Sequence, residues 1–283
     1  MERNFFVKSH GLGNGYIVID SDYITFQIKP DLVKKMCDVH YGIGSDGLLV
    51  KYPSDVADFK LRIFNPDGSE AEKSGNGLRI FCKFLYDYKY TTEDEFTVET
   101  KGGIVKAKIE EKEKGKARVI TVDMGKATFK PEEVPVNIEK DECLDMDLEV
   151  GGRSFKVNCV SVGNPHCVVI VDELNEEDIK RFGPLIENHP LFPNRTNVQF
   201  VKLLSKEEVS ILIWERGAGF TLASGSSSCG VASVMVKKGL TDRRIKVNMP
   251  GGTLTIEVDP NFNIRMTGEV REVCRGVLSD EFF

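Results

Sequence analysis

The pattern of apolar and polar positions predicts a chain dominated by short strands. β-branched and aromatic residues gather in short runs that are separated by turn residues. We expect strands at 16–20, 59–64, 117–123, 166–172, 196–203 and 208–214. Gly-Gly pairs at 102–103, 151–152 and 251–252 stand between such runs. Each pair predicts a hairpin turn, because glycine adopts positive φ without steric cost.

Helical periodicity is confined to a few segments. Residues 75–90 place four apolar side chains on one helical face, and residues 225–239 are small and apolar up to a Lys-Lys-Gly ending that predicts a C-cap. Shorter helices are expected at 31–39 and 175–188. The segment 126–147 contains two prolines and many charges, so we expect a linker that crosses between domains.

An internal repeat is the most informative feature of the sequence. When the chain is shifted by 150 residues, Gly13-Asn14 falls on Gly163-Asn164 and Ser74-Gly75 falls on Ser224-Gly225. Strand ends and Gly-Gly turns align at nearly the same offset. A single offset that matches turns, strand ends and helix starts predicts two pseudo-symmetric α/β domains.

Both Ser-Gly pairs stand at the start of a predicted helix. The first N–H groups of a helix have no partner within the helix, and the helix dipole is positive at that end. A serine there is by itself an ordinary N-cap. Capping alone does not require a serine at the equivalent position of both repeats, however. The pair Ser74 and Ser224 therefore indicates a site that holds a small carboxylate.

Composition narrows the classes of function. The 283 residues carry a formal net charge of −6, which argues against nucleic acid or an anionic membrane as a partner. The sequence contains no run of about 18 apolar residues, so no membrane span is expected. The first residues lack the apolar stretch of a signal peptide, so a cytoplasmic location is expected.

Motifs for metals, nucleotides and hydrolysis are absent from the sequence. The seven cysteines are scattered without a C-x-x-C pair, which is typical of reduced cytosolic thiols, and neither they nor the four histidines have the spacing of a metal site. Tyr16 breaks the G-x-G-x-x-G spacing that Gly11 and Gly13 begin, and Leu222 breaks G-x-S-x-G around Ser224.

Several segments together resemble diaminopimelate epimerase. They are KSHGLGNGYIVID (8–20), FNPDGSEAEKSGNGLR (64–79), GNPH (163–166), GPLIENHPLFPNRTNVQFV (183–201) and ERGAGFTLASG (215–225). The resemblance implies an α/β (α+β) fold of two domains, each a curved, mostly antiparallel sheet wrapped around a central helix. The expected domains are 1–126, completed by a strand at about 270–283, and 127–269. It also implies a homodimer and catalysis without pyridoxal phosphate or metal.

The implied reaction inverts one α-carbon of diaminopimelate, on the route to lysine and peptidoglycan. In this family a cysteine precedes each central helix, one acting as base and the other as acid, and those positions are Ser74 and Ser224 here. The substrate-binding positions that match are Asn14, Asn65, Gly75, Asn76, Asn164, Asn197, Glu215, Arg216, Gly225 and Ser226. The resemblance implies that Arg216 and the helix ends bind carboxylates, while Glu215 and His166 orient or tune the acid–base pair.

The sequence departs from the family at several positions, and one of them is Ser226, where the family usually has Thr. Besides the two serines at the helix starts, it has Gly15 in place of Asp, Gly47 in place of a ligand-contacting Gln, and Phe220 in place of Glu. Three explanations stay open: a natural epimerase or racemase that uses serines, an engineered inactive enzyme, and a non-catalytic binding member or an isomerase of another amino acid or dicarboxylate. Engineering accounts for the two helix-start serines and not for Gly15, Gly47 or Phe220, which favour a divergent natural branch.

Overall fold

The structure is a computed structural model that describes residues 2–283. The chain divides into two compact units, one of residues 1–122 and 267–283 and the other of residues 123–266. Unit 1 contains β1 (Phe5–Gly11), β2 (Asn14–Asp20), α1 (Pro30–Cys37), β3 (Leu48–Tyr52), β4 (Phe59–Phe64), β5 (Glu70–Ala71), α2 (Gly75–Asp87), β6 (Glu95–Thr100), β7 (Gly103–Glu113), most of β8 (Lys116–Lys126) and β18 (Arg271–Val277).

Unit 2 repeats the same order of elements. It contains β9 (Met146–Val150), β10 (Arg153–Ser161), β11 (Pro165–Ile170), α3 (Glu176–Glu187), β12 (Asn197–Ser205), β13 (Glu208–Glu215), β14 (Gly219–Thr221), α4 (Gly225–Lys237), β15 (Arg244–Met249), β16 (Gly252–Val258) and the first part of β17 (Asn263–Glu269). Single 3₁₀ turns lie at Ser21–Tyr23 and Asp280–Phe282.

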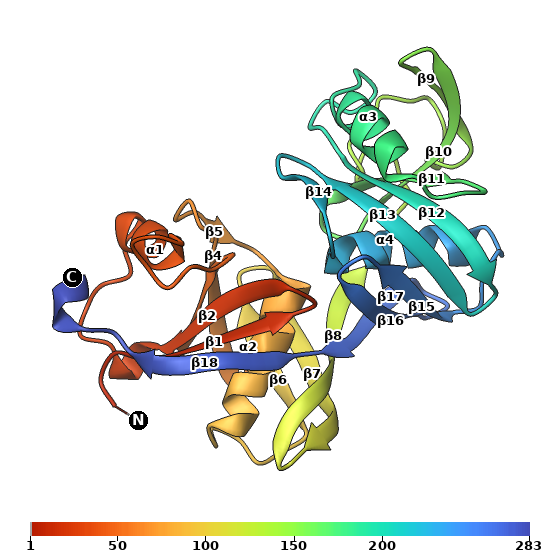
Figure 1. The fold of residues 1–283 in the computed structure, drawn as a ribbon. Coiled ribbons are helices and arrows are strands. Elements are labelled where there is room, and N and C mark those ends of the chain that lie inside the picture. The colour runs from red at the N-terminus through yellow and green to blue at the C-terminus, as the bar shows by residue number, and fades with distance from the viewer. Residues whose placement is uncertain (1) are drawn as a thin grey trace. The chain divides into compact units, whose positions relative to one another are not determined.

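The sheet of each unit alternates antiparallel and parallel pairs in the same sequence (Figure 1). In unit 1, β1 and β2 are antiparallel, β2 and β3 parallel, β3 and β4 antiparallel, and β4 and β6 parallel. In unit 2, β10 to β13 and then β15 follow the same pattern. A parallel pair requires a crossover connection. Each of α1 to α4 lies in one of these crossovers, so the sheet topology positions these helices.

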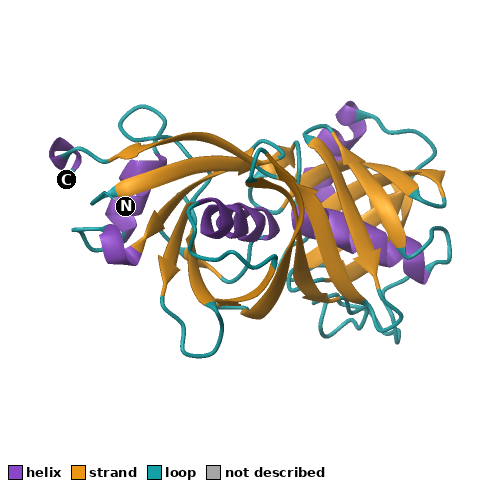
Figure 2. Ribbon diagram, turned by 90° about the horizontal axis from the view of Figure 1, so that it is seen from below, coloured by secondary structure: helices purple, strands orange, loops and turns teal. Residues whose placement is uncertain are grey.

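The second crossover helix of each unit is enclosed by its own sheet. Every residue of α2 from Gly75 to Leu85 is buried, and α4 is buried at nearly every position from Gly225 to Met235. A helix that is buried all round needs cover on every side. Figure 2 shows how the curved sheet of unit 1 surrounds its central helix. The N-terminus of α2 therefore lies close to strands of unit 1, and the N-terminus of α4 lies close to strands of unit 2.

The main sequence predictions are confirmed. All six expected strands and all four helices are present, with ends within a few residues of the predicted ones, and each Gly-Gly pair lies in or beside a turn between antiparallel strands. The fold class is confirmed as well. The two central helices each have 13 residues and begin 150 residues apart, as the repeat predicts.

The interpretation of residues 126–147 as a crossing linker is wrong. This segment belongs to unit 2, and its apolar side chains are buried in that unit's core. Val134, Val136 and Cys143 pack with strand residues there, and the backbone of Thr128 pairs with Ser161. The prolines and charges indicated irregular backbone correctly, but they concealed the apolar residues between them, which drive the segment onto the core.

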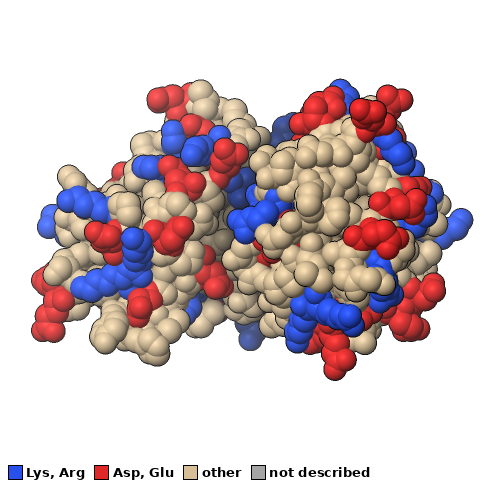
Figure 3. All heavy atoms as spheres, turned by 90° about the horizontal axis from the view of Figure 1, so that it is seen from above, with Lys and Arg blue, Asp and Glu red and all other residues tan. Residues whose placement is uncertain are grey.

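Charges of both signs alternate over the surface of each unit. Figure 3 shows Lys and Arg interspersed with Asp and Glu on the face that it draws, without a broad area of one sign. Among the described residues, the structure has no helix long and apolar enough to span a membrane.

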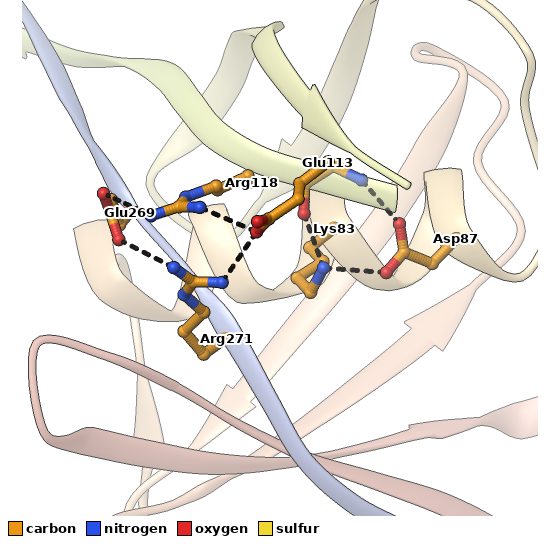
Figure 4. A network of polar contacts seen from close by, with 7 residues as sticks. Lys83, Asp87, Glu113, Arg118, Glu269 and Arg271 are labelled. Carbon is orange, nitrogen blue, oxygen red and sulfur yellow. Dashed lines mark hydrogen bonds and ion pairs between the residues drawn. The ribbon is translucent and has the colours of Figure 1, made fainter. Parts of the chain in front are cut away.

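A buried ion pair connects α2 to β8, and a second group of ion pairs beside it connects β7, β8, β17 and β18 (Figure 4). The Lys83 ammonium lies 2.8 Å from the Asp87 carboxylate, one helical turn later, and both side chains are buried. Lys83 donates to the carbonyl of Ala117, whose N–H donates to Asp87 over 2.8 Å. Outside this buried pair, the half-exposed side chains of Arg118, Arg271, Glu113 and Glu269 form further ion pairs.

We predict that Asp87→Asn destabilises the protein far more than the loss of a surface ion pair does. Removing one partner from a buried pair leaves an uncompensated charge and costs about 3–5 kcal/mol of unfolding free energy. Glu176→Gln is the matched control, because Glu176 and Lys180 also form a 2.8 Å pair at i,i+4 but are half exposed. That loss should stay below about 1 kcal/mol. Urea unfolding measures both, and equal losses would contradict the prediction.

Candidate active site

The start of α2 is capped by Ser74. Its backbone is extended, and its Oγ accepts a hydrogen bond of 3.1 Å from the N–H of Gly77. The phenol oxygen of Tyr16 lies 3.2 Å from the same Oγ. Because Tyr16 belongs to β2, a strand end and a helix start meet at this serine.

Two predicted asparagines lie beside Ser74 in a connected series of side chains. Asn76 donates to the carbonyl oxygen of Asn14 over 3.1 Å, and its own carbonyl accepts from the buried Arg79 guanidinium over 2.8 Å. Asn14 donates to the Asp46 carboxylate over 3.2 Å. Each side chain of the series is oriented by the next, so the amides near the helix end are fixed before any ligand binds.

Asn65 lies in the loop after β4 and has a different partner. Its side-chain amide donates to Ser69 Oγ over 3.0 Å, and its backbone N–H bonds to the Ser69 carbonyl. The structure therefore joins Asn14, Ser74, Gly75 and Asn76 around one helix end, whereas the side chain of Asn65 is engaged within its own loop.

Ser224 caps α4 as Ser74 caps α2. Its Oγ accepts from the Ser227 N–H over 3.4 Å, and its own N–H points to Met249 Sδ at 3.4 Å. Glu215, the last residue of β13, is the neighbouring ionisable group. Burial raises the pKa of the Glu215 carboxyl, and the Ser224 hydroxyl partly offsets that rise.

His166 is buried on β11 and orients Asn164. Burial, with the nearby charge of Arg216, lowers its pKa to about 3, so the ring is neutral. Gln199 lies 3.1 Å from Nδ1 and 3.0 Å from Ser227 Oγ, while Nε2 lies 3.0 Å from the carbonyl of Asn164. An amide N–H donated to Nδ1 leaves the ring proton on Nε2, where it is donated to Asn164. The Asn164 amide, 3.5 Å from Ser226 Oγ, thereby points toward the start of α4.

Asn197 and Arg216 are held together by the backbone. The Asn197 amide donates to the carbonyl of Pro165 over 2.8 Å and accepts from the Arg216 N–H over 3.0 Å. The Arg216 guanidinium is half buried and donates to the carbonyl of Asn194 over 2.9 Å. This bond uses only part of its donors, so the remaining N–H groups can bind a carboxylate.

Sequence reasoning missed several residues that build these two helix ends. They are Tyr16, Asp46, Arg79, Glu187 and Gln199. The carboxylate of Glu187 is buried and accepts from Trp214 Nε1 over 2.7 Å and from the Gly217 N–H over 3.0 Å, which fixes the loop after Glu215. Gln199 had a usable signal, because it stands two residues after Asn197, on the same face of the strand, with only apolar residues beside it.

Two of the departures from the family have a clear structural setting. The N–H of Gly15 donates to Asp46 over 2.7 Å, so an aspartate at position 15 would bring a second carboxylate close to the first. Phe220 packs against the unit 2 core with the Lys180 ammonium 4.6 Å from its ring centre. Its side chain therefore fills apolar space and offers a ligand no charge.

Solved structures share this architecture at low sequence identity. A hydroxyproline epimerase from Agrobacterium vitis has a TM-score of 0.71 at 14% identity, covering 97% of this chain and 90% of its own. A PhzF-family phenazine biosynthesis protein from Bacillus anthracis has a TM-score of 0.68 at 18% identity, covering 99% and 100%. These likenesses define the fold, a pair of sheet-wrapped helices that occurs in several kinds of enzyme.

The sequence comparisons define the family. Residues 6–130 and 158–273 match the family diaminopimelate epimerase. Diaminopimelate epimerase 2 of Nostoc sp. is 47% identical over 98% of this chain and 96% of its own length, and diaminopimelate epimerase of Methanococcus maripaludis is 44% identical over 96% and 98%. The chain belongs to the diaminopimelate epimerase family and is an isomerase of the cofactor-independent epimerase class.

We predict that His166 makes stability depend on pH between 7 and 5. The folded state holds the ring neutral, with a pKa of about 3, whereas an unfolded histidine titrates near 6.5. Below about pH 6.5 the unfolded state binds more protons than the folded state. The free energy of unfolding therefore decreases as the pH is lowered, by about 2 kcal/mol between pH 7 and pH 5. Urea unfolding at both pH values should show this loss, and His166→Gln should remove it. His40→Gln, at an exposed position, is the control and should keep it.

Proposed function

We propose that the protein inverts the α-carbon of an amino acid by proton transfer, with Ser74 and Ser224 as the acid–base pair on opposite faces of that carbon. The observation that carries the proposal is the pair of matched helix starts. Each has a serine cap and a neighbouring asparagine that other side chains hold in place. Both serines cap their helices, but capping alone does not require the same residue at the matching place 150 residues further along.

The substrate carboxylate is bound by helix N–H groups and by Arg216. The first turn of each central helix contributes N–H groups at its positive end, from Gly75 and Asn76 in α2 and from Gly225 and Ser226 in α4. Arg216 can add charge-assisted hydrogen bonds of fixed geometry. A carboxylate held in this way places the attached Cα–H bond beside the serine that precedes the helix.

Serine is a weak acid and a weak base compared with the family's cysteine. A free thiol titrates near 8.5, and a helix N-terminus lowers this value further. A serine hydroxyl titrates far higher, and the helix dipole alone is worth only about 0.3–1 kcal/mol at an exposed site. A neighbouring proton acceptor has to supply the difference. The carboxylate of Glu215, a neighbour of Ser224, is the candidate for this acceptor in unit 2.

The first candidate substrate is diaminopimelate, converted from the LL to the meso form, because relatives at 47% and 44% identity are named diaminopimelate epimerases. Gly47 and Phe220 leave out two polar side chains that the family implies. A substrate without the distal end of diaminopimelate is therefore the second candidate.

We predict that the protein catalyses exchange of the α-proton with solvent deuterium. Incubation in D₂O with LL- and meso-diaminopimelate and a panel of amino acids should show α-deuterium in NMR spectra for at least one of them. Ser74→Ala or Ser224→Ala should lower the exchange rate by about 10²–10⁴-fold, because each removes a positioned acid–base group. Ser54→Ala is the control and should leave the exchange rate unchanged, because that serine bonds Glu99 and no predicted site residue.

Other outcomes would support other functions. Ligand affinity by calorimetry that Arg216→Ala abolishes, without exchange at any pH, would indicate a binding protein. Exchange that appears only after Ser→Cys replacement would reject the serine mechanism. A product with a shifted double bond, instead of an inverted centre, would indicate an isomerase of another dicarboxylate.

The proposal includes a homodimer in the cytoplasm. The family resemblance supports the dimer, and the odd number of scattered cysteines, typical of reduced thiols, supports the location. Light scattering after gel filtration should give about twice the 31.6 kDa of one chain. A mass that stays at one chain, at micromolar concentration, would contradict the dimer.

A further inference from the structure

The hydroxyl of Ser74 lies against a phenol. Tyr16 Oη is 3.2 Å from Ser74 Oγ, within hydrogen-bond range, and Gly77 donates to the same oxygen over 3.1 Å. Only 8% of Tyr16 is exposed. Ser74 therefore has an ionisable neighbour of its own, as Ser224 has in Glu215, but the chemistry of the two neighbours differs.

The backbone holds the phenol firmly in this position. Tyr16 pairs with Ser9 of β1, and the next residue, Ile17, pairs with Leu48 of β3. The loop before β3 is bonded to the residue before Tyr16, because the Asp46 N–H and Ser45 Oγ both donate to the carbonyl of Gly15 over 2.8 and 2.9 Å. An aromatic ring anchored from both neighbouring strands keeps its hydroxyl aimed at one point.

Gly47 leaves the space that the ring needs. A Cβ at position 47 would lie 2.6 Å from Tyr16 Cε1 and 2.6 Å from the carbonyl oxygen of Phe64, closer than real Cβ contacts. Any larger side chain at position 47, including the Gln that the family resemblance implies, would collide with the ring. The Tyr16–Ser74 contact therefore depends on the glycine at position 47.

We propose that Tyr16 is the proton-relay partner of Ser74 and provides the acid–base strength that the serine lacks. This inference rests on the proposed function. As a Cα–H bond forms on the Ser74 side, the Ser74 Oγ–H bond breaks. The oxygen takes the Tyr16 proton, leaving a phenolate that solvent water reprotonates. In the opposite direction the same protons return, and no oxidant or reductant takes part.

The relay gives the Ser74 side of the site an ionisable group whose reference pKa is close to that of a cysteine thiol. A phenol has a reference pKa of about 10, near the value of about 8.5 for a thiol. The serine hydroxyl transfers the proton to or from the substrate carbon, and the Gly77 N–H stabilises the negative charge that develops on the serine oxygen.

The test compares Tyr16→Phe in two backgrounds. In the native protein, we expect Tyr16→Phe to lower the α-deuterium exchange rate by at least about 100-fold, because a positioned proton donor is lost. In the Ser74→Cys background the introduced thiol titrates by itself, so the same change should cost less than about tenfold. Tyr90→Phe is the matched control, since that hydroxyl bonds Asp20 instead of Ser74, and it should leave exchange unchanged.

A second variant separates proton transfer from packing. Site-specific 3-fluorotyrosine at position 16 keeps the ring in place and makes the phenol more acidic. The alkaline limb of the pH–rate profile should move to lower pH, which a structural role would not cause. Exchange by the native protein that survives Tyr16→Phe, with an unmoved profile for the fluorinated protein, would overturn the relay alone. No exchange by the native protein with any substrate would overturn the proposed function and the relay together.

Discussion

The parallel crossover is the constraint on which the rest of the structure depends. Two parallel neighbours cannot be joined by a tight turn, so the chain needs a crossover between β4 and β6 and another between β13 and β15, and here each crossover contains a helix. The sheet then curves around that helix and buries it. Its first N–H groups, which have no helical partner, have to be satisfied by a cap and by whatever ligand approaches. The site chemistry begins with this geometric requirement.

The two units meet the requirement with different side chains. In unit 1 the helix end is surrounded by a phenol and by an amide series that leads to Arg79. In unit 2 it is surrounded by a carboxyl whose pKa is raised by burial and by a histidine that burial keeps neutral. An inversion needs one group that accepts a proton and one that donates it. In the proposed mechanism, the unlike partners of the two serines would provide this asymmetry.

The sequence predicted the framework better than the details of the site. Glycine pairs, β-branched runs and the repeat are local or periodic signals, and they located the strands, the helices and both serine caps. Tyr16 was taken only as a residue that breaks a glycine motif, because its role depends on a contact with position 74, 58 residues away. The same holds for Asp46 and Arg79, which act through partners distant in sequence. Residues 126–147 were misjudged for a related reason, since burial depends on the partner surface.

The unequal interiors of the two central helices limit what can be exchanged between the halves of this chain. Helices α2 and α4 have the same length and the same capping residue, yet α2 carries Arg79 and Lys83 inward while α4 has serine, alanine and valine. The carboxylate of Asp87 and the carbonyl of Ala117 accompany the lysine. If α2 were copied into unit 2 in place of α4, it would bring Arg79 and Lys83 without the acceptors that they have in unit 1. The interiors of the two units have therefore diverged so far that the central helix of one unit no longer fits the other.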